Sequence, residues 1–143
     1  MNLMRAVRMG CAGAAIVAAA ACSNSPTTPS SAAYSQTDLR VGSGVAATST
    51  STVTVDYTGW LYDPTKVDGK GLEFGTSTGG EPLTFTLGSS TVIPGWDRGV
   101  PGMQVGGLRR LVIPPSLGYG GVRFGIIPPN ATLVFEVELK AIQ

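Results

Sequence analysis

The stretch T-V-I-P-G-W-D-R-G-V-P-G-M, residues 91–103, decides the fold. Pro94 suits the first turn of a helix, because its missing N–H would have no partner there. Gly102 lies where a chain can leave a helix in a left-handed conformation. We therefore predict one short helix, roughly from Pro94 to Val100. A short helix that carries the bulky Trp96 cannot bury itself, so a sheet is expected to wrap around it.

The segments on either side of this helix are typical of β-strands. Residues 52–61 alternate, with Val53, Val55 and Tyr57 on one side, and this period of two indicates a half-buried strand. Similar patterns or short apolar runs predict further strands at 37–41, 72–74, 83–87, 108–113 and 133–139. The sequence thus predicts an α+β domain, a twisted antiparallel sheet of five or six strands wrapped around one short α-helix.

Composition narrows the chemistry that the chain can perform. Its 143 residues have a formal net charge of +1 and include no histidine. Scattered Lys and Arg provide no basic surface for nucleic acid, and we expect Arg109 and Arg110 at a solvated sheet edge rather than in a binding patch. Without histidine, a Ser-His-Asp triad and His-ligated metals are excluded. We expect neither a metal nor a cofactor.

The first 21 residues are expected to be a signal peptide. Arg5 and Arg8 form a charged start, and an alanine-rich apolar run follows that is shorter than the ~20 apolar residues of a spanning helix. Ala19-Ala20-Ala21-Cys22 resembles the cleavage site of bacterial lipoproteins, in which the cysteine is acylated and anchors the chain. Cys22 is therefore the predicted lipidation site, whereas Cys11 lies inside the apolar run. An ordinary secreted protein, cut near Ala21, is the alternative.

Residues 22–36 are expected to be the lipidated cysteine and a tether. The segment S-N-S-P-T-T-P-S-S-A-A, residues 23–33, is too polar to bury enough apolar surface to order itself. The folded domain is then 37–143. This organisation predicts an extracytoplasmic protein of the cell envelope that is held to a membrane by its lipid anchor.

The long loop at 116–130, S-L-G-Y-G-G-V-R-F-G-I-I-P-P-N, is unusual enough to suggest a function. Aromatic and aliphatic side chains gather in this loop and at strand ends, namely Tyr57, Phe74, Trp96, Tyr119, Phe124, Ile126 and Ile127. This set suits an apolar cleft with a few hydrogen-bonding groups.

Rotation about an X–Pro amide needs little more than such a cleft. No bond is made or broken, and the barrier of ~18–20 kcal/mol comes from amide resonance. A twisted amide has lost its delocalisation and is less polar, so apolar walls favour it over the planar form. Composition is compatible with this chemistry but does not by itself select it.

Five blocks of sequence resemble the FKBP-type peptidyl-prolyl cis-trans isomerases. In chain order they are V-D-Y-T-G-W-L (55–61), P-L-T-F-T-L-G (82–88), V-I-P-G-W-D-R-G-V (92–100), L-G-Y-G (117–120) and G-I-I-P-P-N-A-T-L-V-F-E-V-E-L (125–139). The resemblance implies an antiparallel sheet curled over one short helix. It also implies an isomerase for proline-containing exported polypeptides, with the family's macrolide inhibitors as candidate ligands. We expect a monomer.

Carried over by position, the resemblance implies a pocket with Trp96 as its floor. The implied catalytic residues are Tyr57, Phe74, Trp96, Tyr119 and Phe135, and the implied substrate-binding residues are Leu83, Val92, Ile93, Ile126 and Ile127. In the family, the backbone N–H at the Ile93 position and the hydroxyl at the Tyr119 position hydrogen-bond carbonyls of the substrate or the macrolide.

The sequence also departs from the family pattern. Gly75 follows Phe74 where the family usually has Asp, and the Arg that often pairs with that Asp has no counterpart. Because both the Asp and its Arg partner are absent, no unpaired charge is left in the pocket. Their absence still removes a polar part of the pocket wall, so activity could be reduced. The turn 78–81 and the loop 119–125 each look one residue short, and Leu83 occupies a wall position that is often Phe.

Other interpretations remain open at this point. A chaperone module could bind proline-containing segments with weak or no catalysis, and a purely structural envelope lipoprotein is a third hypothesis. Without the family pattern, Trp96 would more often be a core residue, and Tyr57 an ordinary strand tyrosine.

Overall fold

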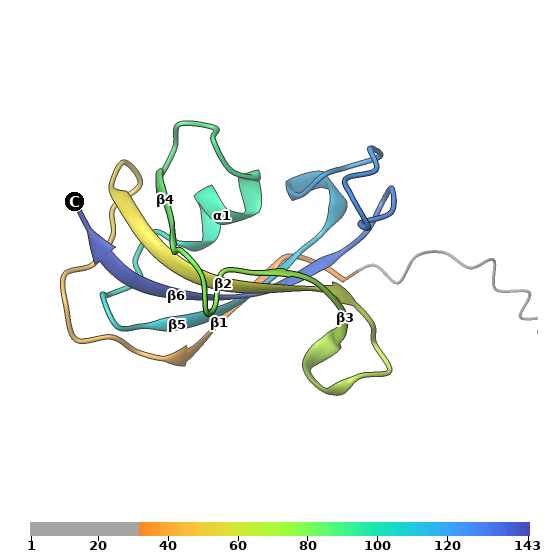
Figure 1. Ribbon diagram of the computed structural model, residues 1–143, viewed down its shortest axis with the longest axis horizontal. Coiled ribbons are helices and arrows are strands. Elements are labelled where there is room, and N and C mark those ends of the chain that lie inside the picture. The colour runs from red at the N-terminus through yellow and green to blue at the C-terminus, as the bar shows by residue number, and fades with distance from the viewer. Residues whose placement is uncertain (1–31) are drawn as a thin grey trace, which may run out of the picture.

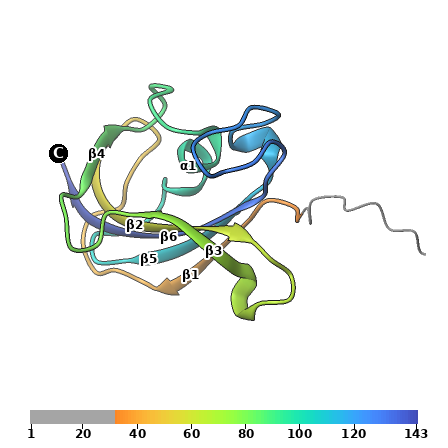
Figure 2. The same ribbon diagram turned by 45° about the vertical axis from the view of Figure 1, so that its right-hand side comes forward.

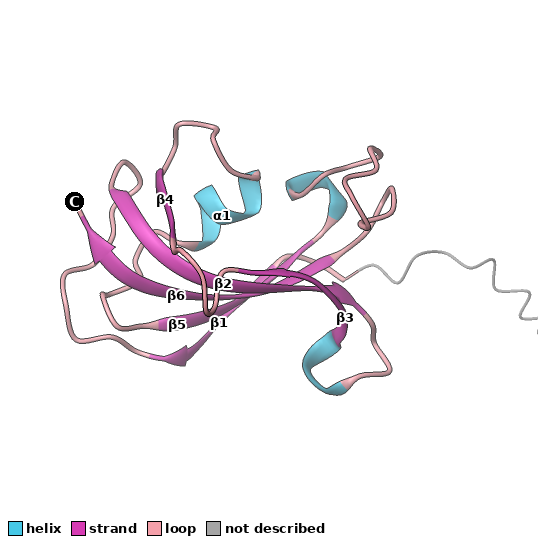
Figure 3. Cartoon of the chain, in the orientation of Figure 1, coloured by secondary structure: helices cyan, strands magenta, loops and turns pink. Residues whose placement is uncertain are grey.

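The computed structural model describes residues 32–143, in which six strands form one antiparallel sheet and α1 (Pro94–Gly99) lies on one side of it (Figure 1). The strands are β1 Ser35–Arg40, β2 Thr52–Tyr62, β3 Lys70–Thr76, β4 Leu83–Thr86, β5 Leu108–Ile113 and β6 Leu133–Ile142. Two short 3-10 turns are also present, η1 Val67–Gly69 and η2 Pro115–Leu117 (Figure 3). The predicted α+β class is confirmed.

The order of strands in the sheet is β1-β5-β6-β2-β3, and β4 pairs with the first half of β2, beyond the part that β3 occupies. The central strands β2 and β6 turn side chains inward, and Val53, Val55, Val137 and Leu139 are completely buried there. Above this face, α1 lies between β4 and the loop that leads to β6 (Figures 1 and 2). The sheet therefore wraps the helix as expected.

Glycines let α1 approach β5 closely. A Cβ at Gly95 would lie 2.6 Å from Ile113 side-chain atoms, and one at Gly99 would lie 2.5 Å from the Leu111 side chain. The helix ends one residue before the predicted Val100, which is its C-cap, and Gly102 has the expected left-handed conformation with φ of 89°. Close packing on β5 thus determines where Trp96 stands.

Some strand boundaries differ from the prediction. β1 begins at Ser35 rather than 37, and Tyr34 packs against the core, so the last residues of the expected tether belong to the fold. β3 is longer than the predicted 72–74, because pairing with β2 supplies the order that its glycine-interrupted sequence does not reveal. β4 ends at Thr86, although Leu87 beyond it is buried.

The prediction that Arg109 lies at a solvated sheet edge is wrong. β5 is flanked by β1 and β6, and Arg109 is buried. Its Nε donates to Asp38 Oδ1 at 2.6 Å, and its guanidinium also donates to the carbonyl oxygens of Gly99 at 2.7 Å and Pro101 at 3.2 Å. Arg109 therefore joins β1 to the end of α1.

The same prediction is wrong for Arg110, which lies next to Arg109 on β5, between β1 and β6. Arg110 forms ion pairs of 3.0 Å with Glu136 on β6 and with Asp68 in η1. The Asp68 contact ties η1 to the outer face of the sheet.

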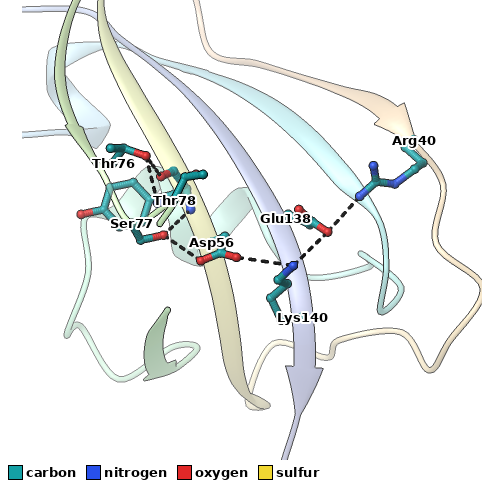
Figure 4. A network of polar contacts seen from close by, with 8 residues as sticks. Arg40, Asp56, Thr76, Ser77, Thr78, Glu138 and Lys140 are labelled. Carbon is teal, nitrogen blue, oxygen red and sulfur yellow. Dashed lines mark hydrogen bonds and ion pairs between the residues drawn. The ribbon is translucent and has the colours of Figure 1, made fainter. Parts of the chain in front are cut away.

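A polar network covers the face of the sheet that α1 leaves open (Figure 4). Ser77 Oγ donates to Asp56 at 3.0 Å, and Lys140 Nζ lies 3.4 Å from Asp56 and 3.3 Å from Glu138. Arg40 extends the network by a 3.0 Å contact with Glu138. Exposed pairs of this kind contribute little stability each, but they identify this face as the solvated one.

The predicted signal peptide, Cys22 and the tether as far as residue 31 lie outside the described residues. Within 32–143, no helix combines the length and apolar character that a membrane crossing requires.

Candidate active site

A cavity of about 560 Å³ lies between the inner face of the sheet, α1 and the loop before β6. The cavity is lined by all ten residues to which the resemblance gave catalytic or substrate-binding roles: Tyr57, Phe74, Leu83, Val92, Ile93, Trp96, Tyr119, Ile126, Ile127 and Phe135. This volume is within the ordinary range for sites that take a small ligand or a short chain segment. The structure thus brings the predicted residues together, and their individual roles in catalysis stay predictions.

The buried ring of Trp96 forms the floor. It meets Tyr57 with ring centroids 5.2 Å apart at 74° and Phe135 at 5.2 Å and 88°, while Phe85 packs nearby at 5.5 Å. Edge-to-face pairs of this type contribute about 0.5–1.5 kcal/mol each beyond their buried area. The floor is therefore a preformed aromatic cluster. Phe135 lines the cavity, as predicted, whereas Phe85 does not.

Gly59, in the middle of β2, makes this cluster possible. A Cβ at this position would lie 2.5 Å from the Phe74 ring and 2.8 Å from the Phe135 ring. These two rings pack edge to face across the glycine, with centroids 5.4 Å apart. Gly59 was not predicted from the sequence, although a lone glycine within a regular strand pattern is a known sign of close approach.

The backbone of Tyr57 is held by Ser77. The Tyr57 N–H donates to Ser77 Oγ at 2.9 Å, and the Ser77 N–H donates to the Tyr57 carbonyl at the same distance. Through its hydroxyl, Ser77 also joins the outer network at Asp56 (Figure 4). Hydrogen bonds between Ser77 and the Tyr57 backbone thus help to hold Tyr57 in the cavity wall, in addition to the packing of its ring.

Two hydrogen-bond donors at the wall are left free, and within the described residues the buried Nε1–H of the Trp96 floor also has no partner. Ile93 is the extended N-cap of α1, and its carbonyl accepts from Trp96 N–H at 3.0 Å. Among residues 32–143, neither the Ile93 N–H nor the Tyr119 hydroxyl has a hydrogen-bond partner. Both donors are therefore available to a carbonyl oxygen in the cavity.

The electrostatics of the site are those of neutral donors. None of the described residues that line the cavity carries a charge at neutral pH. Burial raises the pKa of Tyr119 above its ordinary value, and the neighbouring Tyr57 raises it further. Tyr119 is thus a neutral O–H donor, and the site offers no acid or base for proton transfer near neutral pH.

Four further residues line the cavity, namely Gly75, Thr91, Phe124 and Gly125. The sequence singled out Gly75 as a departure from the family pattern and placed Phe124 among the side chains of an apolar cleft, but it did not indicate that Phe124 stacks on Tyr119. Thr91 and Gly125 were missed, and their only signal is that they adjoin predicted residues. A Cβ at Gly75 would meet no atom within 4 Å, so this part of the wall is open.

Comparison with known proteins gives consistent matches. A family model described as FKBP-type peptidyl-prolyl cis-trans isomerase matches residues 44–140. The FK506-binding protein of Neisseria meningitidis serogroup B is 48% identical over 103 residues, which cover 71% of this chain and 89% of that protein. FK506-binding protein 1 of Aspergillus oryzae is 45% identical over 105 residues, which cover 71% of this chain and 90% of that protein.

Solved structures agree with these matches. AtFKBP13 has a TM-score of 0.63 at 35% identity, covering 77% of this chain and 93% of its own. FkpA from Escherichia coli has a TM-score of 0.64 at 44% identity, covering 80% of this chain but only 50% of FkpA, so the chain spans half the length of that protein. Since the family model matches well over half of the chain and the relatives approach half identity, the chain belongs to the FKBP-type peptidyl-prolyl cis-trans isomerase family.

Proposed function

We propose that this isomerase accelerates X–Pro rotation in exported proteins by binding the twisted amide in its aromatic cavity. The observation that carries the proposal is the combination of a Trp96 floor with two free donors at the wall, Ile93 N–H and the Tyr119 hydroxyl, and no charge in the described lining. Such a site offers apolar walls to the proline ring and hydrogen bonds to carbonyls beside it.

The rate acceleration would come from differential binding. The barrier of ~18–20 kcal/mol reflects amide resonance, which the twisted amide lacks. Apolar walls favour that less polar form, and the Ile93 N–H and Tyr119 hydroxyl would hold substrate carbonyls while the amide rotates. No residue has to exchange a proton, which agrees with the uncharged lining.

We further propose that the protein acts outside the cytoplasm as a monomer, anchored through acylated Cys22. Uncatalysed X–Pro isomerisation takes about 10–100 s, which is slow enough to limit the folding of exported chains. The names of the curated relatives describe FK506 binding, and we propose macrolides of this type as ligands of the same cavity.

A protease-coupled isomerisation assay on an Ala-Leu-Pro-Phe peptide tests the activity, using the chain from Ser23 onward. We expect clear acceleration by the wild type and a loss in Trp96→Leu and Tyr119→Phe. Tyr62→Phe is the matched control, because Tyr62 does not line the cavity. A folded wild type that gives no acceleration would contradict the enzymatic proposal.

A Pro-peptide-binding chaperone is the second candidate. Gly75 leaves one wall without the family's carboxylate, and Phe124 and Ile126 expose more than half of their surface at the mouth. Tryptophan fluorescence in a Trp60→Phe variant would report on Trp96 during peptide titration. Binding without acceleration would favour the chaperone, and failure to bind either a Pro-peptide or a macrolide would favour a structural lipoprotein.

A further inference from the structure

The ring of Phe124 stacks on the ring of Tyr119. Their rings are stacked with centroids 4.4 Å apart and an interplanar angle of 4°. Phe124 nevertheless exposes 57% of its surface, so this ring does not serve mainly to fill the core. Both residues line the cavity. The contact therefore lies at the site and on its solvent side.

A tight hairpin determines where the Phe124 ring stands. The N–H of Phe124 donates to the Ile127 carbonyl at 3.1 Å, and the N–H of Ile127 donates to the Phe124 carbonyl at 2.9 Å. Gly125, the first of the two central residues, has φ of 56°, as glycine does in a type II′ turn. Because Ile127 is buried, the hairpin is anchored in the core and presents Phe124 from a rigid base.

Tyr119, in contrast, has little else on its solvent side to hold it. It stands between Gly118 and Gly120, and its hydroxyl has no hydrogen-bond partner within residues 32–143. Its backbone carbonyl accepts a 3.3 Å hydrogen bond from Val122, which restrains the loop but not the ring. Its inner side packs against the core, and the stack on Phe124 is the contact that holds the ring from the solvent side.

We propose that Phe124 is a positioning residue that holds the Tyr119 ring at the cavity wall, where its hydroxyl meets a substrate carbonyl. The part of this inference that concerns the substrate rests on the proposed isomerase function. The part that concerns the ring does not, because it can be measured without a substrate.

A double-mutant cycle separates positioning from direct substrate contact. We expect Phe124→Ala to lower kcat/KM by about two- to tenfold, as loss of one aromatic pair permits, and Phe124→Tyr to restore it. If Phe124 acts through the Tyr119 hydroxyl, adding Phe124→Ala to Tyr119→Phe should cause no further loss. Val122→Ala is the matched control, because Val122 is exposed in the same loop and does not line the cavity.

Tyrosine-labelled NMR supplies the readout that needs no catalysis. The pKa of Tyr119 is raised mainly by burial, and Tyr57 is the other titratable group in the described lining. Phe124→Ala uncovers the phenol, so its pKa should fall towards the ordinary value, whereas Phe124→Leu should cause a smaller fall and Val122→Ala none.

Two results would overturn the inference. One is a pKa of Tyr119 that Phe124→Ala leaves unchanged. The other is a kcat/KM in the Phe124→Ala, Tyr119→Phe double variant that falls by the product of the two single losses. A wild type without isomerase activity would contradict the proposed function instead, and the phenol titration would still decide whether Phe124 positions Tyr119.

Discussion

Single residues at the cavity act through hydrogen-bond donors and through the space that glycine leaves. Tyr119 presents a neutral hydroxyl, Ile93 presents a backbone N–H, and Gly75 leaves a section of wall open. None of these features depends on ionisation near neutral pH, so the chemistry of the site should change little around neutral pH.

The pH dependence should therefore appear only on the alkaline side. Burial raises the pKa of Tyr119 above 10.0, so the folded state binds this proton more tightly than the unfolded state. The resulting stability is fully present below the unfolded pKa of about 10 and is lost as pH rises through the folded value. We expect kcat/KM of the wild type to stay level from about pH 6 to 9 and to fall only above this range.

Stopped-flow assays and urea titrations across this range check the prediction. Tyr119→Phe is the comparison, because it lacks the phenol that loses its proton at alkaline pH. Burial also raises the pKa of Tyr34, so an alkaline loss of stability should persist in part in that variant. An activity that already declines between about pH 7 and 8 would point to a group other than Tyr119.

Gly75→Asp should raise activity if the missing carboxylate limits it. A side chain at this position meets no atom within 4 Å and the backbone has no positive φ, so the variant should fold with unchanged stability. Hydrogen bonds to charged groups contribute about 1.5–3 kcal/mol, so a gain of about ten- to a hundredfold in kcat/KM is expected. Gly75→Ala controls for volume, and equal activity in all three proteins would mean that the cavity has already compensated.

At the scale of elements, the site depends on how closely α1 packs against β5. Gly95→Ala places a methyl group against three atoms of the β-branched Ile113 side chain, the nearest at 2.6 Å, and a branched side chain near its backbone cannot move aside easily. Overpacking of this kind costs about 1–3 kcal/mol. We expect that loss in the free energy of unfolding by urea, whereas Gly75→Ala should change it little.

Arg109 holds the other end of α1. Arg109→Leu would leave the Gly99 and Pro101 carbonyls without their donor and Asp38 without its partner. Buried groups that lose their partners cost about 1–3 kcal/mol each, so we expect the free energy of unfolding to fall by about 2–4 kcal/mol. Arg40→Ala removes an arginine whose side chain is half exposed and should cost no more than about 1 kcal/mol. Equal losses in the two variants would refute the structural role of Arg109.

At the scale of the whole molecule, the sheet separates two surfaces with different tasks. Its inner face carries the cavity, and its outer face carries the network from Arg40 to Asp56 (Figure 4). The chain enters the fold at Tyr34, which packs on the core. Our proposal for the whole chain is that residues before this point connect the domain to a membrane.

Cys22→Ala tests the anchor directly. We expect this variant to be released from the membrane fraction and to incorporate no labelled palmitate, because acyl chains on Cys22 are the proposed attachment. Cys11→Ala is the matched control and should remain in the membrane fraction. Isomerase activity per molecule should be the same in both variants, since the cavity lies entirely within the described domain.

Much of the fold could be predicted from local patterns, and the reason is physical. Residues 52–61 and 133–139 alternate because each strand has one buried face, and the structure confirms both strands as β2 and β6. β3 was underestimated because Gly71 and Gly75 interrupt its period, so that pairing with β2, rather than side-chain pattern, makes it a strand. The five motif blocks contain nine of the ten predicted residues that line the cavity, because these residues lie in short contiguous segments, and only Phe74 lies outside the blocks.

The sequence by itself determined the α+β class, the single short helix between strands and the family to which its motif blocks pointed. Only the tertiary structure decided the order of the strands, the burial of Arg109 against Asp38, and the packing of Phe74 and Phe135 across Gly59. The physical reason is the distance along the chain between the residues that interact. Helix ends and strand periods depend on neighbours along the chain, whereas the Asp38–Arg109 pair joins residues 71 positions apart, and its energy exists only after the sheet has brought them together.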